Sequence, residues 1–263
     1  MGKRPRFLGG AALTLSRVAT RLGRRLGWYG SRDKTYSVRH QTVRRIFSTF
    51  RINCVLDVGA HHGDFAAQLR MEGYTGLIIS FEPVSENFRV LQERSASDPR
   101  WRVHQMALGS RRGSAEMRVF GSSTFHSLLD ASEYGRERFP GSLELERTEA
   151  APIEELQHIL DGLVAGIAEP HIFLKVDTQG YDLEVIRGLG PAAARIDALQ
   201  MELTTRPLYE HSTNSVTTAL AELAELGFRL SAVIPILYEP DGVTLVEFDC
   251  LMCRSAGPKG ATP

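Results

Sequence analysis

The stretch VLDVGAHHGDF, residues 55–65, decides the fold. Its apolar run ends in Asp57 and passes into a loop that contains Gly59 and Gly63. An apolar run followed by a glycine-containing turn and a helix is typical of the first strand of a doubly wound α/β sheet. Ligands of such sheets bind beyond the carboxyl ends of the strands, so this turn is the expected ligand site.

From residue 53 onward, apolar runs alternate with amphipathic stretches, which is the pattern of strands joined by helical crossovers. The predicted strands lie at residues 53–59, 77–83, 101–109, 114–121, 172–180 and 198–205. The predicted helices lie at residues 64–73, 85–94, 151–163, 181–190 and 215–228. Residues 121–150 show no clear period, so we expect a long loop with helical fragments that serves as a binding loop or lid.

Residues 229–254 contain two apolar runs separated by EPDGV, which is a hairpin signal. The predicted fold class is therefore α/β, with a doubly wound, mostly parallel, Rossmann-like sheet that ends in a C-terminal antiparallel hairpin. Asp249 alternates with apolar neighbours in the hairpin, and we expect it on a solvated face. Cys250 and Cys253 point to opposite faces of one strand and are expected to be structural.

The first turn differs from a dinucleotide-binding turn. A dinucleotide site shows G-x-G-x-x-G, whereas the spacing here is G-x-x-x-G with Asp57 directly before it. A carboxylate at that point repels a pyrophosphate but can accept hydrogen bonds from an ammonium group. Glu82 ends the second strand, where an acid can bind ribose hydroxyls. These features favour S-adenosylmethionine as the ligand, with an NAD(P)-dependent oxidoreductase as the enzymatic alternative.

Six blocks resemble, in the same order, those of FkbM-type methyltransferases: DVGAHHGDF, FEPVSENFRVLQ, ALGS, FLKVDTQGYDLEVIRGL, LQMELTTRPLYE and VEFDCLMCR. The resemblance implies a class I fold and S-adenosylmethionine-dependent O-methylation, often of sugars, glycolipids or polyketide-type hydroxyls. The sequence departs from the family's Lys-Ile-Asp-Val-Glu-Gly-x-Glu segment at Thr178, Gln179 and Asp182. Because acids of that segment are altered, a non-catalytic binding module that keeps the fold is a third alternative.

The candidate site residues lie at the expected strand ends and in the long loop. For cofactor binding we assign Asp57, Gly59, Ala60, Gly63, Glu82 and, from the ALGS block, Ala107. An alcohol acceptor needs a base, and Asp177 and Glu202 end neighbouring predicted strands. These two carboxylates could orient a diol, remove a proton or share a divalent cation, although no third acid is closely spaced with them. His126 in the long loop is a further candidate base.

The formal net charge of zero hides a strong asymmetry. Residues 1–51 carry 13 Lys/Arg and one acid, a net charge of +12, and the remainder carries −12. We expect a basic, helical N-terminal extension at residues 1–40, a methyltransferase domain at 41–254 and a flexible tail at 255–263. An apolar stripe and a basic face in residues 1–30 favour either packing on the domain or peripheral contact with anionic lipid.

Composition also limits the location and the partners. No stretch approaches the roughly eighteen consecutive apolar residues of a membrane span, and the three cysteines fit an intracellular chain. We therefore expect a cytoplasmic protein that can associate with a membrane through its N-terminus. The acidic body argues against nucleic acid as a partner, which leaves a small-molecule or glycolipid acceptor. The sequence defines neither the oligomeric state nor a metal requirement.

Overall fold

A computed structural model describes residues 34–254 of the chain. Contacts between Cα atoms divide the chain into two units, Met1–Gln41 and Thr42–Pro263. The predicted helix of the basic extension and the predicted flexible tail lie outside the described residues, so both stay predictions, as do the expected domain boundaries.

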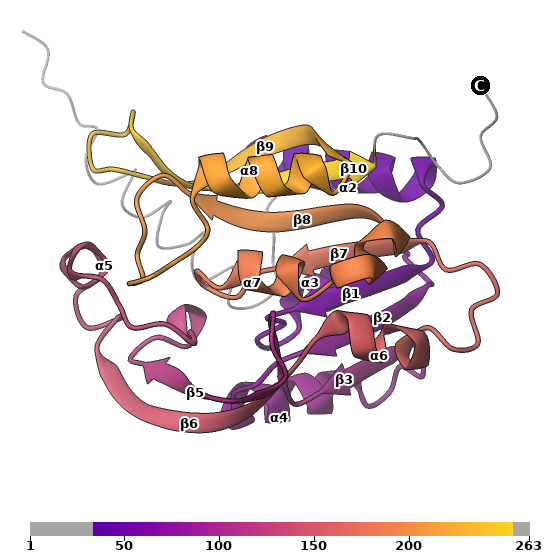
Figure 1. The fold of residues 1–263 in the computed structure, drawn as a ribbon, viewed down its shortest axis with the longest axis horizontal. Coiled ribbons are helices and arrows are strands. Elements are labelled where there is room, and N and C mark those ends of the chain that lie inside the picture. Colours follow the sequence, from indigo (N-terminus) through magenta and orange to yellow (C-terminus); the bar gives the residue numbers. More distant parts are fainter. Residues whose placement is uncertain (1–33, 255–263) are drawn as a thin grey trace, which may run out of the picture. The chain divides into compact units, whose positions relative to one another are not determined.

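A seven-stranded sheet forms the centre of the second unit, in the order β3-β2-β1-β7-β8-β10-β9 (Figure 1). Its strands are β1 Cys54–Val58, β2 Leu77–Phe81, β3 Trp101–His104, β7 Ile172–Val176, β8 Ile196–Thr204, β9 Phe228–Tyr238 and β10 Leu245–Arg254. All neighbours are parallel except β10, which runs antiparallel to both β8 and β9. This arrangement confirms the predicted fold class, including the terminal hairpin.

Helices cover both faces of this sheet, which explains why β1 and β7 are buried along their whole length and are apolar except for Asp57 and Lys175. On one face pack α6 Leu156–Leu163, α7 Asp182–Arg187, the 3-10 helix η2 Gly190–Arg195 and α8 Val216–Glu225. On the other face pack α3 Asp64–Met71, α4 Ser85–Ser95 and the end of α2 Lys34–Thr49, through Val43 and Ile46.

A second, three-stranded sheet was not predicted. It has the order β4-β6-β5 and consists of β4 Ala107–Leu108, β5 Gly113–Phe120 and β6 Leu145–Glu154. The strand predicted at 101–109 breaks after His104, and its two halves join different sheets. Residues 151–154 end β6 instead of opening a helix, because Ala151 and Ile153 are buried at the two-residue period of a strand.

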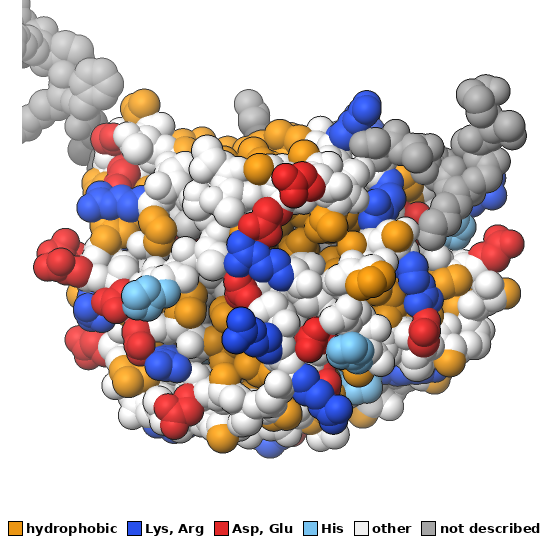
Figure 2. Space-filling model, in the orientation of Figure 1, with side chains coloured by type: hydrophobic (Ala, Val, Ile, Leu, Met, Phe, Trp, Pro, Cys, Tyr) orange, Lys and Arg blue, Asp and Glu red, His pale blue; other side chains and the backbone are white. Residues whose placement is uncertain are grey.

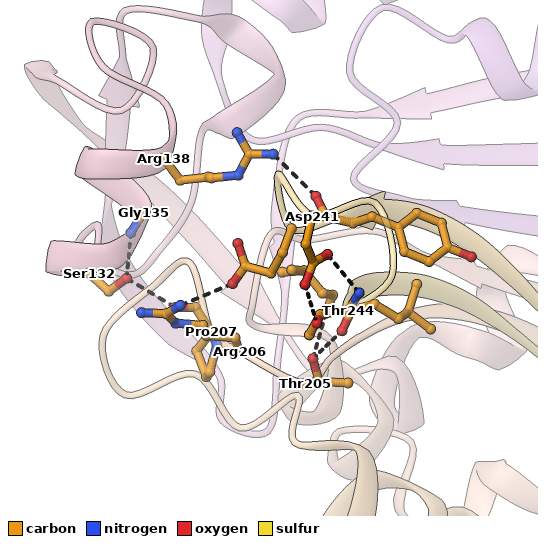
Figure 3. Close-up of polar contacts among 12 residues, drawn as sticks. Ser132, Gly135, Arg138, Thr205, Arg206, Pro207, Asp241 and Thr244 are labelled. Carbon is orange, nitrogen blue, oxygen red and sulfur yellow. Dashed lines mark hydrogen bonds and ion pairs between the residues drawn. The ribbon is translucent and has the colours of Figure 1, made fainter.

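The segment between β5 and β6 contains the 3-10 helix η1 Ser123–Phe125 and helix α5 Glu133–Arg138. Hydrogen bonds attach α5 and the residue before it to the loop after β8 and to the last residue of β9 (Figure 3). Ser132 Oγ donates to the carbonyl of Pro207 over 3.0 Å, and Arg138 Nη2 donates to the carbonyl of Tyr238 over 3.2 Å. The predicted long loop is therefore a packed insertion with its own contacts.

Strand β9 forms one edge of the large sheet and carries exposed apolar side chains. Leu230, Val233 and Ile236 are 49%, 42% and 43% exposed, and Figure 2 shows hydrophobic side chains gathered along this edge. Pro235 interrupts the row of backbone donors, a feature that protects edge strands from further pairing. Among residues 34–254, no helix is long and apolar enough to cross a membrane.

Candidate active site

The first turn lies where the carboxyl ends of β1, β2 and β7 meet, because both neighbours of β1 are parallel to it. Packing explains its two glycines. Gly59 has φ +73°, and a Cβ there would lie 1.9 Å from the carbonyl oxygen of Asp177. Gly63 has φ +83°, and a Cβ there would lie 2.7 Å from the ring of Trp101. Gly59 thus lets the first turn lie directly against the end of β7.

Glu82, at the end of β2, is held firmly in place and is only 5% exposed. Its Oε2 accepts the backbone N–H of His61 over 2.8 Å, and its Oε1 accepts that of Val84 over 3.0 Å. Burial raises the pKa of Glu82 to about 7, although these two amides act in the opposite direction. Asn87 Nδ2 also donates to Oε1, over 3.4 Å, so one of the about four acceptor positions of the carboxylate remains for a hydroxyl of a ribose.

Asp57 is fully buried and forms an ion pair with a side chain of the neighbouring strand. Lys175 Nζ lies 3.1 Å from Asp57 Oδ1, and Ser80 Oγ donates to Asp57 Oδ2 over 3.2 Å. Burial lowers the pKa of Lys175, but the carboxylates of Asp57 and Asp177 outweigh it and hold the pKa above the ordinary lysine value. The ammonium group beside Asp57 is therefore that of Lys175, and contact between Asp57 and a cofactor ammonium stays a prediction.

Asp177 is the exposed acid of the site, with 41% of its side chain accessible. Its Oδ2 lies 3.5 Å from Lys175 Nζ, and its Oδ1 accepts a hydrogen bond from Gln179 Nε2 over 2.9 Å. Gln179 Oε1 in turn lies 2.9 Å from the hydroxyl of Tyr209. Two donors thus orient a carboxylate that solvent and an acceptor can reach.

Glu202 lies next to Asp177 on the same face of the sheet, because Val176 pairs with Met201 in the register of β7 and β8. Its surroundings differ. Burial, and then the carboxylate of Glu247 on β10, raise the pKa of Glu202 well above its usual range. Glu202 and Glu247 also share a side-chain hydrogen bond, so a proton held by this pair lies between the two carboxyl groups.

Asp249 was predicted on a solvated face, and this prediction is wrong: the residue is 6% exposed. Strand β10 is not the edge of the sheet but lies between β8 and β9, so its polar side chain is enclosed. Asp249 pairs with Glu202 in the register of β10 and β8, which adds another acid to the surroundings of Glu202.

His126 follows η1, and its hydrogen bonding does not favour the role of a base. Its Nδ1 accepts the backbone N–H of Phe120 over 3.1 Å, so the neutral ring carries its proton on Nε2. Burial, and then the charge of Arg147, lower the pKa of His126 to about 4. The exposed ring nitrogen of the neutral form is therefore a donor.

His61 connects the first turn to the insertion. Its backbone holds Glu82, and its Nε2 lies 2.9 Å from Ser123 Oγ in η1. Burial, and then the neighbouring His62, lower the pKa of His61 to about 4, so the ring is neutral. The sequence carries no signal for the contact between His61 and Ser123, which are 62 residues apart.

The remaining assigned cofactor residues, Ala60 and Ala107, are 4% and 7% exposed. Ala60 donates its backbone N–H to the carbonyl of Phe81, and Ala107 opens β4. Their contact with a cofactor stays a prediction. In the part of the chain that the structure describes, no group of three or more His, Cys, Asp or Glu side chains is arranged to hold a metal ion.

The comparisons with known proteins agree with this geometry. The model of the methyltransferase FkbM domain matches residues 57–230, more than half of the chain. A search of curated proteins found no match.

Solved structures show distant likenesses. An rRNA methylase from Streptococcus thermophilus shares 10% identity over 86% of this chain and 99% of its own, with a TM-score of 0.46. TrmK of M. capricolum in complex with S-adenosyl-homocysteine shares 8% identity over 83% of this chain and 71% of its own, with a TM-score of 0.43. Fibrillarin of Aeropyrum pernix in complex with S-adenosyl-L-methionine shares 11% identity over 75% of this chain and 66% of its own, with a TM-score of 0.41.

These scores are too low to transfer a substrate. The match over residues 57–230 includes the first turn, Glu82, Asp177 and Glu202, and it agrees with the strand order of the sheet. It also sets aside the oxidoreductase alternative. The chain belongs to the FkbM family of S-adenosylmethionine-dependent methyltransferases.

Proposed function

We propose that this protein transfers a methyl group to a hydroxyl of a saccharide, glycolipid or polyketide-type acceptor, with Asp177 as the base. The observation that carries the proposal is the position of Asp177. It is accessible, it is oriented by Lys175 and Gln179, and its backbone touches Gly59 of the first turn. A base in that place lies beside both the expected cofactor and an entering acceptor.

The residues of the first turn fit S-adenosylmethionine, whose sulfonium supplies an already activated methyl group. Glu82 is buried, fixed by two backbone amides and the side chain of Asn87, and still able to accept one hydroxyl donor, which suits a ribose. The residues expected to hold the cofactor are Glu82, Gly59, Ala60, Gly63 and Ala107. Asp57 contributes through its pair with Lys175, which keeps the end of β7 in place beside the turn.

The chemistry of the acceptor follows from the two acids. An alcohol is a poor nucleophile at neutral pH until a base takes its proton, and Asp177 is placed to do so. Burial, and then the carboxylate of Glu247, raise the pKa of Glu202, and the two side chains share a hydrogen bond, so we do not assign Glu202 as the base. The oxygens of this pair can accept hydrogen bonds from further hydroxyls, which suits a polyhydroxylated acceptor better than an isolated hydroxyl.

The expected partners follow from charge. The acids outnumber the bases by 12 beyond residue 51, which disfavours a polyanionic acceptor such as RNA. Contact of residues 1–30 with anionic lipid would bring the enzyme to a glycolipid acceptor.

Calorimetric titration tests the first part of the proposal. Saturable binding of S-adenosylmethionine, without binding of NAD or NADP, is the expected result. Transfer of labelled methyl groups to free monosaccharides and to extracted glycolipids tests the second part. Asp177→Asn should keep cofactor affinity within about threefold and lower turnover at least 100-fold, since general base catalysis contributes about 10²–10⁴-fold. Cofactor binding without transfer to any acceptor would instead favour a non-catalytic module.

A further inference from the structure

A chain of hydrogen bonds runs from Asp177 into the insertion. It begins at Asp177 Oδ1, passes through the side-chain amide of Gln179 and reaches the hydroxyl of Tyr209. That hydroxyl also lies 2.9 Å from the carbonyl oxygen of Phe125, the last residue of η1. Tyr209 is 3% exposed, so water does not readily replace these partners. We call these four residues the relay.

The backbone of Gln179 is held in an uncommon conformation that directs its side chain into the relay. Its φ is +54°, in the left-handed region, and the next residue, Gly180, has φ +93°. Ser127 Oγ donates to the carbonyl of Gln179 over 2.7 Å and so fixes this turn to the insertion. A non-glycine residue keeps such a conformation only when its surroundings hold it there.

At Tyr209 the relay has two hydrogen-bond acceptors for a single donor proton. The hydroxyl of Tyr209 has a single proton, but two acceptors lie 2.9 Å from it: Gln179 Oε1 and the carbonyl oxygen of Phe125. While Asp177 is ionised, it needs the Nε2 donor of Gln179, so Gln179 Oε1 must face Tyr209. Tyr209 then gives its proton to Gln179, and the carbonyl of Phe125 does not receive it.

Protonation of Asp177 reverses this pattern. Lys175 has only donors and lies on the Oδ2 side of Asp177, so an added proton belongs on Oδ1, which faces Gln179. The amide of Gln179 then turns over, and its oxygen accepts the proton of Asp177. Its Nε2 donates to the oxygen of Tyr209, and Tyr209 gives its own proton to the carbonyl of Phe125.

We propose that Gln179 and Tyr209 are positioning residues that report the protonation of Asp177 to η1, so that the insertion is held more tightly while Asp177 carries a proton. The proposal rests on the proposed role of Asp177 as the base. On that basis the proton that leaves the acceptor hydroxyl ends on Asp177 Oδ1. The insertion is then held beside the first turn, where Ser123 of η1 meets His61, until the proton departs.

Other ionisable groups act on the charge of Asp177 as well. Those that interact with it electrostatically come from the first turn, β7, α7, β8, β10 and the loop after β8: His61, Lys175, Asp182, Glu202, Glu247 and Tyr209. A substitution that imitates protonated Asp177, compared with the parent at one fixed pH, avoids the electrostatic contributions of these groups.

Asp177→Asn imitates the protonated state. Lys175 must meet the amide oxygen of the new side chain, which leaves its NH₂ group as a donor toward Gln179. Hydrogen exchange of the full-length protein, followed by mass spectrometry on peptides that cover residues 121–128, then measures how firmly η1 is held. We expect exchange there to slow by about fivefold at pH 7.5, the effect of one additional hydrogen bond.

Three further variants test the route. In the background of Asp177→Asn, Tyr209→Phe should abolish the slowing, since it removes the proton but keeps the ring. Gln179→Asn should also abolish the slowing of exchange. Asparagine tolerates a positive φ, but its side chain is too short to reach from Asp177 to the hydroxyl of Tyr209. Tyr238→Phe, which removes a tyrosine hydroxyl from partly exposed β9, is the matched control and should leave the slowing intact.

The proposal is overturned if Asp177→Asn does not slow hydrogen exchange in residues 121–128. It is also overturned if Asp177→Asn slows exchange equally in the presence and absence of Tyr209→Phe. Neither readout uses an acceptor or turnover. An Asp177→Asn protein that still transfers methyl groups would remove the base assignment while leaving the exchange result in place. Loss of turnover without a change in exchange would remove the relay alone.

Discussion

Lys175→Met should expose how strongly the site depends on one buried cation. Asp57 is fully buried, and Lys175 Nζ, 3.1 Å away, is the charge that balances it. Methionine keeps much of the length and apolar stem of lysine but removes the ammonium group. An isolated buried carboxylate takes up a proton instead of remaining charged, so folding of the variant should require protonation of Asp57.

The magnitude follows from that proton. Holding a carboxyl group of ordinary pKa 3.9 protonated at pH 7 costs about 4 kcal/mol, and at pH 5 about 1.5 kcal/mol. The first value agrees with the roughly 3–5 kcal/mol lost when one partner of a buried ion pair is removed. Because the folded variant binds one more proton than its unfolded chain, its stability deficit grows as the pH rises through this interval.

Urea denaturation of parent and variant at pH 5 and pH 7, followed by circular dichroism, measures both deficits. Lys175 also lowers the pKa of Glu82, so part of the pH dependence of the deficit comes from Glu82. Asp57→Asn/Lys175→Met lacks the same lysine but has no carboxyl group at position 57, so the part of the pH dependence that comes from Asp57 should disappear. A deficit of Lys175→Met that is equal at both pH values, or below about 1 kcal/mol at pH 7, would show that Ser80 and solvent suffice for Asp57.

Two further predictions concern the first turn. Glu82→Gln should weaken S-adenosylmethionine binding at least tenfold at pH 8 by calorimetry, because hydrogen bonds to a charged acceptor are about twice as strong as neutral ones. Since the pKa of Glu82 is about 7, its ionised form gains population between pH 6 and pH 8, so parent affinity should rise over that interval relative to the variant. Gly59→Ala should lower the thermal midpoint more than Gly63→Ala, because the new Cβ meets a backbone carbonyl at 1.9 Å in the first case and the side chains of Trp101 and Leu91 in the second. Equal midpoints for the two alanine variants would contradict this account.

The large sheet could be predicted from the sequence because its strands are buried on both faces. Such strands are short apolar runs whose ends are marked by polar residues, which is how Glu82, Asp177 and Glu202 were identified. The small sheet gave no such signal. Residues 145–149 of β6 are mostly exposed and four of them are polar, so an apolar period is absent until Ala151.

The partners of the site residues were harder to predict for a different reason. Lys175 lies within the apolar run FLKV, where a single lysine does not change the prediction of a strand. Its importance comes from its pairing with Asp57 on the neighbouring strand of the sheet. Tyr209 is 30 residues from Gln179 in the sequence, and only the fold brings them together. Local patterns identify strand ends, whereas long-range pairs depend on register.

Register also explains why two acids on neighbouring strand ends take different roles. Asp177 and Glu202 lie side by side on one face of the sheet, but Asp177 has Lys175 and Gln179 as donors, whereas Glu202 faces the acids of β10. The two carboxyl groups therefore differ in their surroundings, the kind of separation by environment that allows two carboxyl groups to take different roles. The hairpin that closes the sheet creates this difference: it places Glu247 and Asp249 beside β8, and it is for this reason that we propose Asp177, not Glu202, as the base.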